Sequence, residues 1–284
     1  MTPALLEPLV DRALEEDLAG GDLTTEATVA VGTLAVGRAV AKSELVACGA
    51  EVFATVFRRV DPGLTVDVKV PDGALVPAGT ELWRISGSAR SILMGERTAL
   101  NFVQRMSGTA TLARRFVAAL PAGSATRITD TRKTTPGLRA LERWAVRQGG
   151  AFNHRDALGS AVLIKDNHIE AAGGIRAAIE RSRARAPHTS RVEIEVESLA
   201  ALDEALGAGA DIVMLDNFAP AEVTEAVRRA RARATGPALV EVSGGVTLER
   251  IAALAKAGVD VISVGALTHS APAADISLDI ERVG

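Results

Sequence analysis

The pattern of hydrophobic and polar residues changes near residue 127 of the 284-residue chain. Upstream of this point, helical spacing of apolar residues predicts two amphipathic helices, and one alternating run predicts a half-buried strand. The helices are expected at residues 5–14 and 52–60, and the strand at residues 64–70. A long helical pattern over residues 89–120 is interrupted at Ser107 and Gly108, which predicts a domain junction there.

Downstream of residue 127, short apolar runs alternate regularly with helix-length segments. Six such runs lie at residues 127–131, 161–165, 192–196, 211–215, 238–242 and 260–264. This alternation predicts parallel strands with crossover helices, in either a doubly wound sheet or a β/α barrel. Polar residues follow most of these strands, and functional groups at the carboxyl ends of many strands favour the barrel. With six strands instead of eight, we expect the barrel to be incomplete.

The composition narrows the classes of protein and partner. A hydrophobic fraction of 48% with 24% charged residues is ordinary for a soluble globular enzyme. The net charge of -3 argues against nucleic acid or an anionic membrane as a bulk partner, because both attract cationic surfaces. Cys48 is the only cysteine, the acidic N-terminal segment fits no secretory signal, and no apolar run approaches the roughly 20 residues of a transmembrane helix. We therefore expect a cytoplasmic protein.

Basic residues are concentrated between Asp130 and His168, beside glycine and proline turn signals. These cations are Arg132, Lys133, Arg139, His154, Arg155 and Lys165. Cations at the ends of apolar runs predict a pocket for a small anionic ligand, and arginine suits carboxylate and phosphate because its planar fork binds both oxygens. Lys165 is either a Schiff-base nucleophile or a permanent cation, and its basic neighbours favour the cation. We expect His154 to bond a carboxylate or to orient its neighbours.

Carboxylates alternate with apolar residues over residues 192–197. Glu193, Glu195 and Glu197 share one face of the predicted strand. Since the outer face of a barrel packs on helices, these glutamates point inward, where carboxylates need cations or a metal. We expect Glu195 to bind Mg²⁺ or ribose hydroxyls together with Asp216, which opens the loop after the fourth strand. The alternatives are an ion pair with an interior lysine or arginine, and a helix N-cap for Asp216.

Two glycine-rich turns follow the last two predicted strands. Ser243, Gly244 and Gly245 open one helix, and Gly265 lies directly after the final strand. Backbone N–H groups at such turns bind phosphate, and many barrels build a phosphate site from their last loops. The alternative is two ordinary tight turns.

Several motifs, in their order along the chain, resemble those of the quinolinate phosphoribosyltransferase family. The matching segments are EEDLAGGDLTT (15–25), GERTALN (95–101), DTRKTTPGLR (130–139), GGAFNHR (149–155), LIKDNH (163–168), VEIEVES (192–198), MLDNF (214–218), VSGGV (242–246) and VGALTHS (264–270). The resemblance runs almost end to end. It implies an N-terminal α/β sandwich domain (1–107) and an open β/α barrel (108–269), with the C-terminal tail (270–284) packing back on the first domain.

The resemblance also implies an activity and a set of site residues. The activity is transfer of phosphoribosyl from PRPP (phosphoribosyl pyrophosphate) to quinolinate, with loss of CO₂, in NAD biosynthesis. Mg²⁺ would be held by PRPP, Glu195 and Asp216, with no organic cofactor, and a homodimer would form in which Arg97 enters the neighbouring subunit's site. The residues implied for quinolinate are Arg97, Arg132, His154, Arg155 and Lys165, with Lys133 at the substrate or the pyrophosphate. Those implied for the 5′-phosphate are Ser243, Gly244, Gly245 and Gly265.

Two other functions stay open from the sequence. A Schiff-base aldolase acting on a sugar phosphate would use Lys165. A paralogue of the same fold outside NAD biosynthesis would bind a phosphosugar or serve metal uptake, although residues 130–137 and 165–168 favour the transferase. His168 and Glu241 have no assigned role, and Arg105 is not matched to a family position.

Overall fold

The computed structural model describes residues 2–283 and forms two compact units. The first unit contains the chain up to residue 114, residues 135–150 and the chain from residue 267 onward. The second contains residues 115–134 and 151–266. Each unit has its own principal sheet.

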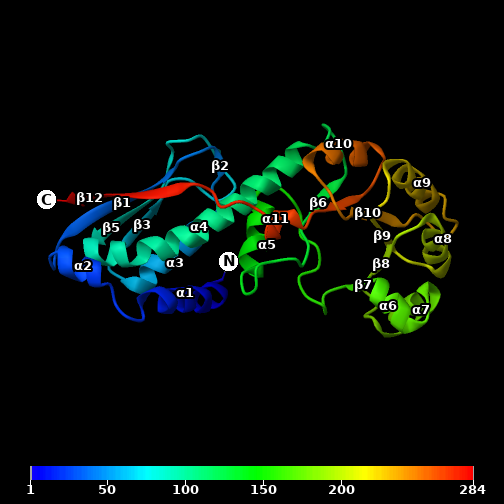
Figure 1. The fold of residues 1–284 in the computed structure, drawn as a ribbon, viewed down its shortest axis with the longest axis horizontal. Helices are drawn as coiled ribbons and strands as arrows, with labels where there is room; N and C mark the ends of the chain where they lie inside the picture. The colour runs from blue at the N-terminus through cyan, green and yellow to red at the C-terminus, as the bar shows by residue number, and fades with distance from the viewer. Residues whose placement is uncertain (1, 284) are drawn as a thin grey trace. The chain divides into compact units, whose positions relative to one another are not determined.

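The first unit is built on a four-stranded antiparallel sheet in the order β12-β1-β5-β3. Its strands are β1 (Leu34–Ala41), β3 (Thr65–Val68), β5 (Glu81–Ser88) and β12 (Ile276–Val283), and a small second sheet pairs β2 (Leu45–Val46) with β4 (Leu75–Val76). The last strand of the chain pairs with the first, so that Ala41 lies opposite Ile276 (Figure 1). The C-terminal segment therefore completes the sheet of this unit.

An apolar core joins the helices of the first unit to its sheet. The helices are α1 (Pro3–Leu18), α2 (Leu23–Thr28), α3 (Ala50–Val60), α4 (Ala89–Ala118) and α5 (Arg139–Gln148), and the short α11 (Ala266–His269) comes before β12. On α3, Phe53 contacts Phe57 with 4.9 Å between ring centroids, and Trp83 of β5 with 5.2 Å. Aromatic pairs at this spacing add to the stabilisation from burial. The helices predicted in residues 5–14 and 52–60 and the strand in 64–70 are confirmed.

Helix α4 shows that the interruption predicted at Ser107 and Gly108 is wrong, because the helix runs through both residues. The Ser107 hydroxyl accepts the backbone N–H of Cys48 and donates to the Cys48 carbonyl oxygen, at 3.1 Å each. A Cβ at Gly108 would collide with the carbonyl oxygen of Pro272, so glycine permits a close approach of the C-terminal segment. Ser107 and Gly108 therefore serve packing within the first unit. The predicted division into residues 1–107 and 108–269 stays a prediction.

The second unit is a six-stranded parallel sheet in the order β6-β11-β10-β9-β8-β7, arranged as an open barrel. The strands are β6 (Arg127–Thr129), β7 (Val162–Ile164), β8 (Val192–Val196), β9 (Ile212–Asp216), β10 (Leu239–Ser243) and β11 (Val261–Ser263). The helices are α6 (Asp166–Ala172), α7 (Ile175–Arg185), α8 (Leu199–Ala208), α9 (Pro220–Arg231) and α10 (Leu248–Lys256), and α7 to α10 lie outside the strands (Figure 1). Strands β6 and β7 are the two edges of this sheet, and among the described residues no strand pairing joins them, so the barrel stays open. The free edge of β6 forms one isolated bridge, between Thr129 and Phe152. The six predicted parallel strands and the incomplete barrel are confirmed.

Alternation along the barrel strands decides which side chains face the interior. The apolar residues of β8 are buried on the helix side, and Glu193 and Glu195 alternate with them on the other face. In the register of the sheet, Glu195 and Glu241 each lie beside Met214 of β9. The same interior face therefore carries carboxylates from two strands.

Candidate active site

A cavity of about 280 Å³ lies at the carboxyl ends of the barrel strands. Its lining residues are Thr131, Arg132, Lys133, His154, Arg155, Leu163, Lys165, Met214, Glu241, Ser243 and Ser263. The residues predicted for the site that line it are Arg132, Lys133, His154, Arg155, Lys165 and Ser243. Cations from three separate segments converge on one cavity, an arrangement that suits an anionic substrate.

Asp130, the first residue after β6, is a buried carboxylate that links the two basic loops. Its oxygens accept the side-chain amide of Asn153 and the backbone N–H of His154, at 2.7 Å each. On the same loop, the hydroxyl of Thr131 accepts the N–H of Lys133 at 3.1 Å. A buried carboxylate is stable when N–H donors satisfy it. Asp130 therefore fixes the paths of both loops before a ligand binds.

A second buried carboxylate, Glu142 of α5, holds the chain that follows the Arg132–Lys133 loop. Glu142 is 1% exposed and accepts the backbone N–H of Thr135 at 3.0 Å and its hydroxyl at 2.7 Å. The Arg105 guanidinium donates to the same carboxylate at 2.8 and 3.2 Å. Arg105, which was not matched to a family position, therefore neutralises a buried carboxylate of the first unit.

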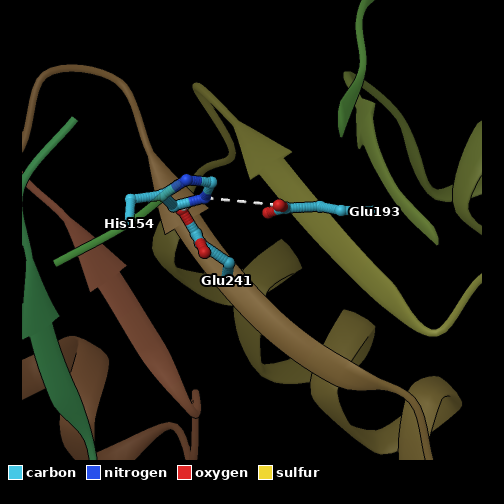
Figure 2. A group of neighbouring side chains, drawn as sticks. All are labelled: His154, Glu193 and Glu241. Atoms are coloured by element: carbon cyan, nitrogen blue, oxygen red, sulfur yellow. Dashed lines mark ion pairs between the residues drawn. The ribbon is translucent and has the colours of Figure 1, made fainter. Parts of the chain in front are cut away.

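His154 lies between two buried glutamates (Figure 2). Its Nε2 is 3.2 Å from Oε2 of Glu193 on β8 and 3.6 Å from Oε1 of Glu241 on β10. Burial raises the pKa of Glu193 to about 7, with Glu241 adding to the rise and His154 opposing it. Burial lowers the pKa of His154, but hydrogen bonds and charges from both glutamates outweigh it and raise the value to about 10.

The other ring nitrogen of His154 decides where the protons of this cluster lie. Nδ1 accepts the backbone N–H of Arg155 at 2.8 Å, and an imidazolium, which has a proton on both nitrogens, cannot accept it. A neutral imidazole protonated on Nε2, beside one protonated glutamate, has the same number of protons as an imidazolium between two carboxylates. The raised pKa of His154 favours the imidazolium, whereas the Arg155 contact and the raised pKa of Glu193 favour the neutral ring. We assign the neutral ring, because the contact requires it.

Lys165, at the end of β7, forms an ion pair with Glu195. Its Nζ lies 2.5 Å from Oε2 of Glu195, with 45% and 12% of the two side chains exposed. The backbone N–H of Lys165 donates to Nδ1 of His168 at 3.0 Å, which fixes the start of α6. Glu195 therefore forms an ion pair with a lysine, as the alternative to metal binding predicted. Glu193 contacts a histidine instead, and Glu197 lies beyond the end of β8 and is exposed.

Asp216 is the last residue of β9 and does not cap the next helix, whose N-cap is Ala219. The N-cap alternative is therefore wrong. One Asp216 oxygen accepts the side-chain amide of Asn217 at 2.9 Å, and Asn217 has a left-handed backbone with φ of 56°. A Cβ at Gly244 would lie 2.6 Å from Oδ1 of both residues, so glycine leaves room for two oxygens where the loops after β9 and β10 meet.

Six predicted site residues lie outside the cavity lining, and two of them are Glu195 and Asp216 at the carboxyl ends of β8 and β9. Gly244, Gly245 and Gly265 lie in the turns after β10 and β11. Helix α10 begins at Leu248 with Thr247 as its N-cap, so the first of these turns comes shortly before the helix and does not itself open it. Arg97 lies in the first unit, where it is exposed on α4.

Glu195 and Asp216 have the donor chemistry that Mg²⁺ requires. They present carboxylate oxygens from the adjacent strands β8 and β9, and each already contacts a protein group, Lys165 or Asn217. Two carboxylates suffice for a cation that brings phosphate and water oxygens as its other ligands. The donor set therefore fits Mg²⁺ that arrives with a phosphorylated substrate.

Three residues that organise the site were missed or given no role in the sequence analysis. Glu241 alternates with apolar residues on β10 as Glu195 does on β8, so the same argument would have placed it in the interior. Asp130 was visible only as a polar residue after a strand. The left-handed backbone of Asn217 has no sequence signal beyond the tolerance of asparagine for this conformation.

The second unit is thus an open β/α barrel with a cation-lined cavity at its strand ends, the position at which enzymes of this architecture bind their substrates. Residues 22–107 match the N-terminal domain, and residues 109–279 the C-terminal domain, of the family described as quinolinate phosphoribosyl transferase. The chain belongs to the quinolinate phosphoribosyltransferase family, as its motifs indicated.

Named relatives and solved structures agree with this assignment. The chain is 44% identical over 274 residues to the nicotinate-nucleotide pyrophosphorylase (carboxylating) of Mycobacterium leprae, with 95% of each protein covered. The human protein of the same name is 39% identical over 281 residues, which cover 99% of this chain and 93% of that protein. The crystal structure of NadC from Streptococcus pyogenes has a TM-score of 0.94 at 38% identity, covering 100% and 99%. Within residues 2–283, no helix combines the length and hydrophobicity needed to span a bilayer.

Proposed function

We propose that this chain transfers the phosphoribosyl group of PRPP to the ring nitrogen of quinolinate, with loss of CO₂. The product is nicotinate mononucleotide, an intermediate in NAD biosynthesis. The observation that carries the proposal is the convergence of Arg132, Lys133, Arg155 and Lys165 on one cavity in a chain of this family. Four cations exceed what one carboxylate needs, and they suit a ring with two adjacent carboxylates.

The reaction exchanges one bond at ribose C1 for another. The ring nitrogen bonds to C1 while the bond from C1 to pyrophosphate breaks, and pyrophosphate leaves with the electron pair. The alkylated ring is positively charged, so it accepts the electron pair released when the adjacent carboxylate departs as CO₂. The ring carbon then takes a proton from solvent. Because the ring is its own electron sink, no pyridoxal or thiamine cofactor is needed.

The cavity suggests how the substrates are divided among its residues. Arg132, Arg155 and Lys165 hold the quinolinate carboxylates, and Lys133 lies at the substrate or the pyrophosphate. Ser243, which lines the cavity, and the glycines at 244, 245 and 265 hold the 5′-phosphate through backbone N–H groups.

Mg²⁺ is proposed as the metal that accompanies PRPP. Glu195 and Asp216 would hold it, and when bound it neutralises the charge that develops on the leaving pyrophosphate. The same two carboxylates favour the positive charge that develops on the ribose.

The contact between Lys165 and Glu195 weighs against an aldolase. A carboxylate oxygen lies 2.5 Å from Nζ and engages this nitrogen in an ion pair, so Lys165 would have to leave that contact before it could attack a carbonyl carbon. The transferase is better supported than a phosphosugar-binding or metal-uptake paralogue. The relatives named above are nicotinate-nucleotide pyrophosphorylases, and this chain matches them over nearly their full lengths.

Assembly as a homodimer is part of the proposal. Arg97 is exposed on α4 of the first unit, a position suited to contact with another subunit. We assign Arg97 to the quinolinate carboxylates of the neighbouring subunit.

A location in the cytoplasm is also part of the proposal. The single cysteine, Cys48, is buried and forms no disulfide, which suits a reducing compartment.

The test is a substrate comparison with the purified chain, PRPP and Mg²⁺. Quinolinate labelled in its 2-carboxylate should release labelled CO₂ in step with nicotinate mononucleotide. Nicotinate, which lacks that carboxylate, should have a kcat/KM lower by about 100-fold or more, because cations are left unpaired. Comparable turnover of nicotinate, or borohydride trapping of a sugar phosphate on Lys165, would contradict the assignment.

A further inference from the structure

Both ring nitrogens of His154 are engaged by the protein. Nδ1 accepts the Arg155 backbone N–H at 2.8 Å, and Nε2 faces Glu193 at 3.2 Å and Glu241 at 3.6 Å (Figure 2). A carboxylate ligand needs a donor, which Nδ1 cannot be while it accepts from Arg155. The Nε2 proton is directed toward the glutamates. The ring is therefore poorly arranged to bind a quinolinate carboxylate, although it lies at the cavity.

The same contacts give His154 a different role toward its neighbour. Asp130 holds the backbone N–H of His154 at 2.7 Å, so the residue is fixed from both its backbone and its ring. The ring in turn holds the backbone N–H of Arg155, and the Arg155 guanidinium donates to the Ala161 carbonyl at 2.9 Å. Arg155 lines the cavity, so its placement determines where one guanidinium meets the substrate.

Glu193 and Glu241 both contact Nε2 of the imidazole, and Glu193 also acts on Arg155 through its charge. They are 4% and 3% exposed, and they come from strands that are not neighbours, since β9 lies between β8 and β10. Two carboxyl groups so deeply buried, one of them protonated in the assignment above, are unfavourable for folding unless a hydrogen-bond partner compensates them. Their shared described partner is Nε2 of His154, and a donor there leaves Nδ1 as the acceptor.

We propose that Glu241 and Glu193 are positioning residues that orient His154 for Arg155, and that His154 places this arginine instead of binding quinolinate itself. The proposal rests on the function proposed above. It assigns a role to Glu241, and it changes the role expected for His154 from ligand to support.

A pair of amide substitutions separates the two roles of His154. In His154→Asn the amide oxygen can occupy the Nδ1 position and accept the Arg155 N–H, whereas His154→Gln places its amide near the Nε2 position and loses that acceptor. A positioning role predicts the higher quinolinate KM in His154→Gln, by about tenfold over wild type for one lost hydrogen bond near a charged group, with His154→Asn closer to wild type. A direct substrate contact through Nε2 predicts the reverse order, which would overturn the proposal.

Glu241→Gln tests the support for the ring, because glutamine keeps the size of the side chain. We expect a higher KM for quinolinate with the KM for PRPP unchanged. We also expect its effect to shrink in an Arg155→Lys background, because both changes act on one contact. Additive effects, or equal changes in both KM values with a lowered melting temperature, would show that Glu241 only stabilises the barrel. If wild type does not convert quinolinate, the proposed function fails; if wild type is active and these patterns are absent, only this inference fails.

Discussion

The ammonium nitrogen of Lys165 lies 2.5 Å from a carboxylate oxygen of Glu195, at the ends of two neighbouring parallel strands. Each residue follows a register pair, Ile164 opposite Ile194, so the ion pair is set by the sheet. A basic side chain of the proposed quinolinate site thus lies beside a proposed metal ligand. In the proposed arrangement, quinolinate binds the basic member of this ion pair and Mg-PRPP binds the acidic member.

Glu195→Gln should weaken the binding of Mg-PRPP without weakening the binding of quinolinate. Removing the carboxylate should raise the KM for Mg-PRPP by about tenfold to a hundredfold, on the scale of a lost charge-assisted contact. Quinolinate binding should stay the same or tighten, because Lys165 loses a competing anion. Initial-rate kinetics for PRPP and calorimetry for quinolinate measure the two effects.

Glu197→Gln is the matched control, since Glu197 follows the end of β8 and is exposed. This variant should leave the KM for Mg-PRPP and the affinity for quinolinate unchanged. If Glu195→Gln unfolds the chain and abolishes binding of both substrates, then the ion pair serves stability and not PRPP.

Gly244→Ala should damage the turn where Asp216 and Asn217 meet. A Cβ there would be 2.6 Å from an oxygen of each side chain, on a backbone with φ of 80°. The conformation alone costs about 1–2 kcal/mol for an L-residue, and the contacts should also displace Asp216. We expect a lower melting temperature together with a higher KM for PRPP.

Gly236→Ala controls for the backbone strain. Gly236 has a similar positive φ of 99°, but a Cβ there would meet nothing within 4 Å. This variant should lose stability and keep its KM for PRPP. Equal KM values in the two variants would show that the space beside Asp216 is not needed for the substrate.

The buried pair of Arg105 and Glu142 should dominate the stability of its surroundings. Glu142→Gln leaves the guanidinium without its carboxylate, and breaking such a pair lowers the free energy of unfolding by about 3 kcal/mol. Urea unfolding followed by circular dichroism measures the change. Arg228→Ala, which breaks a pair with 68% of the Arg228 side chain exposed, should barely move the midpoint. Similar losses in both variants would contradict this ranking.

The alternation of residues along β8 was enough to predict that its glutamates face the barrel interior. It was not enough to predict their partners. Glu195 meets Lys165 because β7 and β8 are neighbours, and Glu193 meets His154 from a loop that follows neither strand. Strand order and register decide these pairs, and both depend on contacts between residues far apart in sequence.

The break predicted in α4 was also wrong, and a contact between residues far apart in sequence lies at this position. Gly108 lowers local helix propensity, which predicted a break. Its actual partner is the backbone at Pro272, more than 160 residues later in the chain, and the helix runs through Gly108 without a break. The N-cap alternative for Asp216 failed in the same way, because the residue type suits a cap but the helix begins farther along, after Ala219.

Arg97 allows the proposed assembly and the proposed site to be tested together. If this arginine completes the neighbouring subunit's site, then the smallest active unit is a two-fold dimer. Arg97→Ala and Lys165→Ala should each be nearly inactive alone, because each homodimer carries the lesion in both of its sites. In a mixed dimer one site has both lesions and the other has neither. Random re-association makes about half of the dimers mixed, so activity should return to roughly a quarter of wild type. Subunit exchange is verified by native mass spectrometry, and if activity stays absent after exchange, Arg97 acts in its own subunit or outside the chemistry.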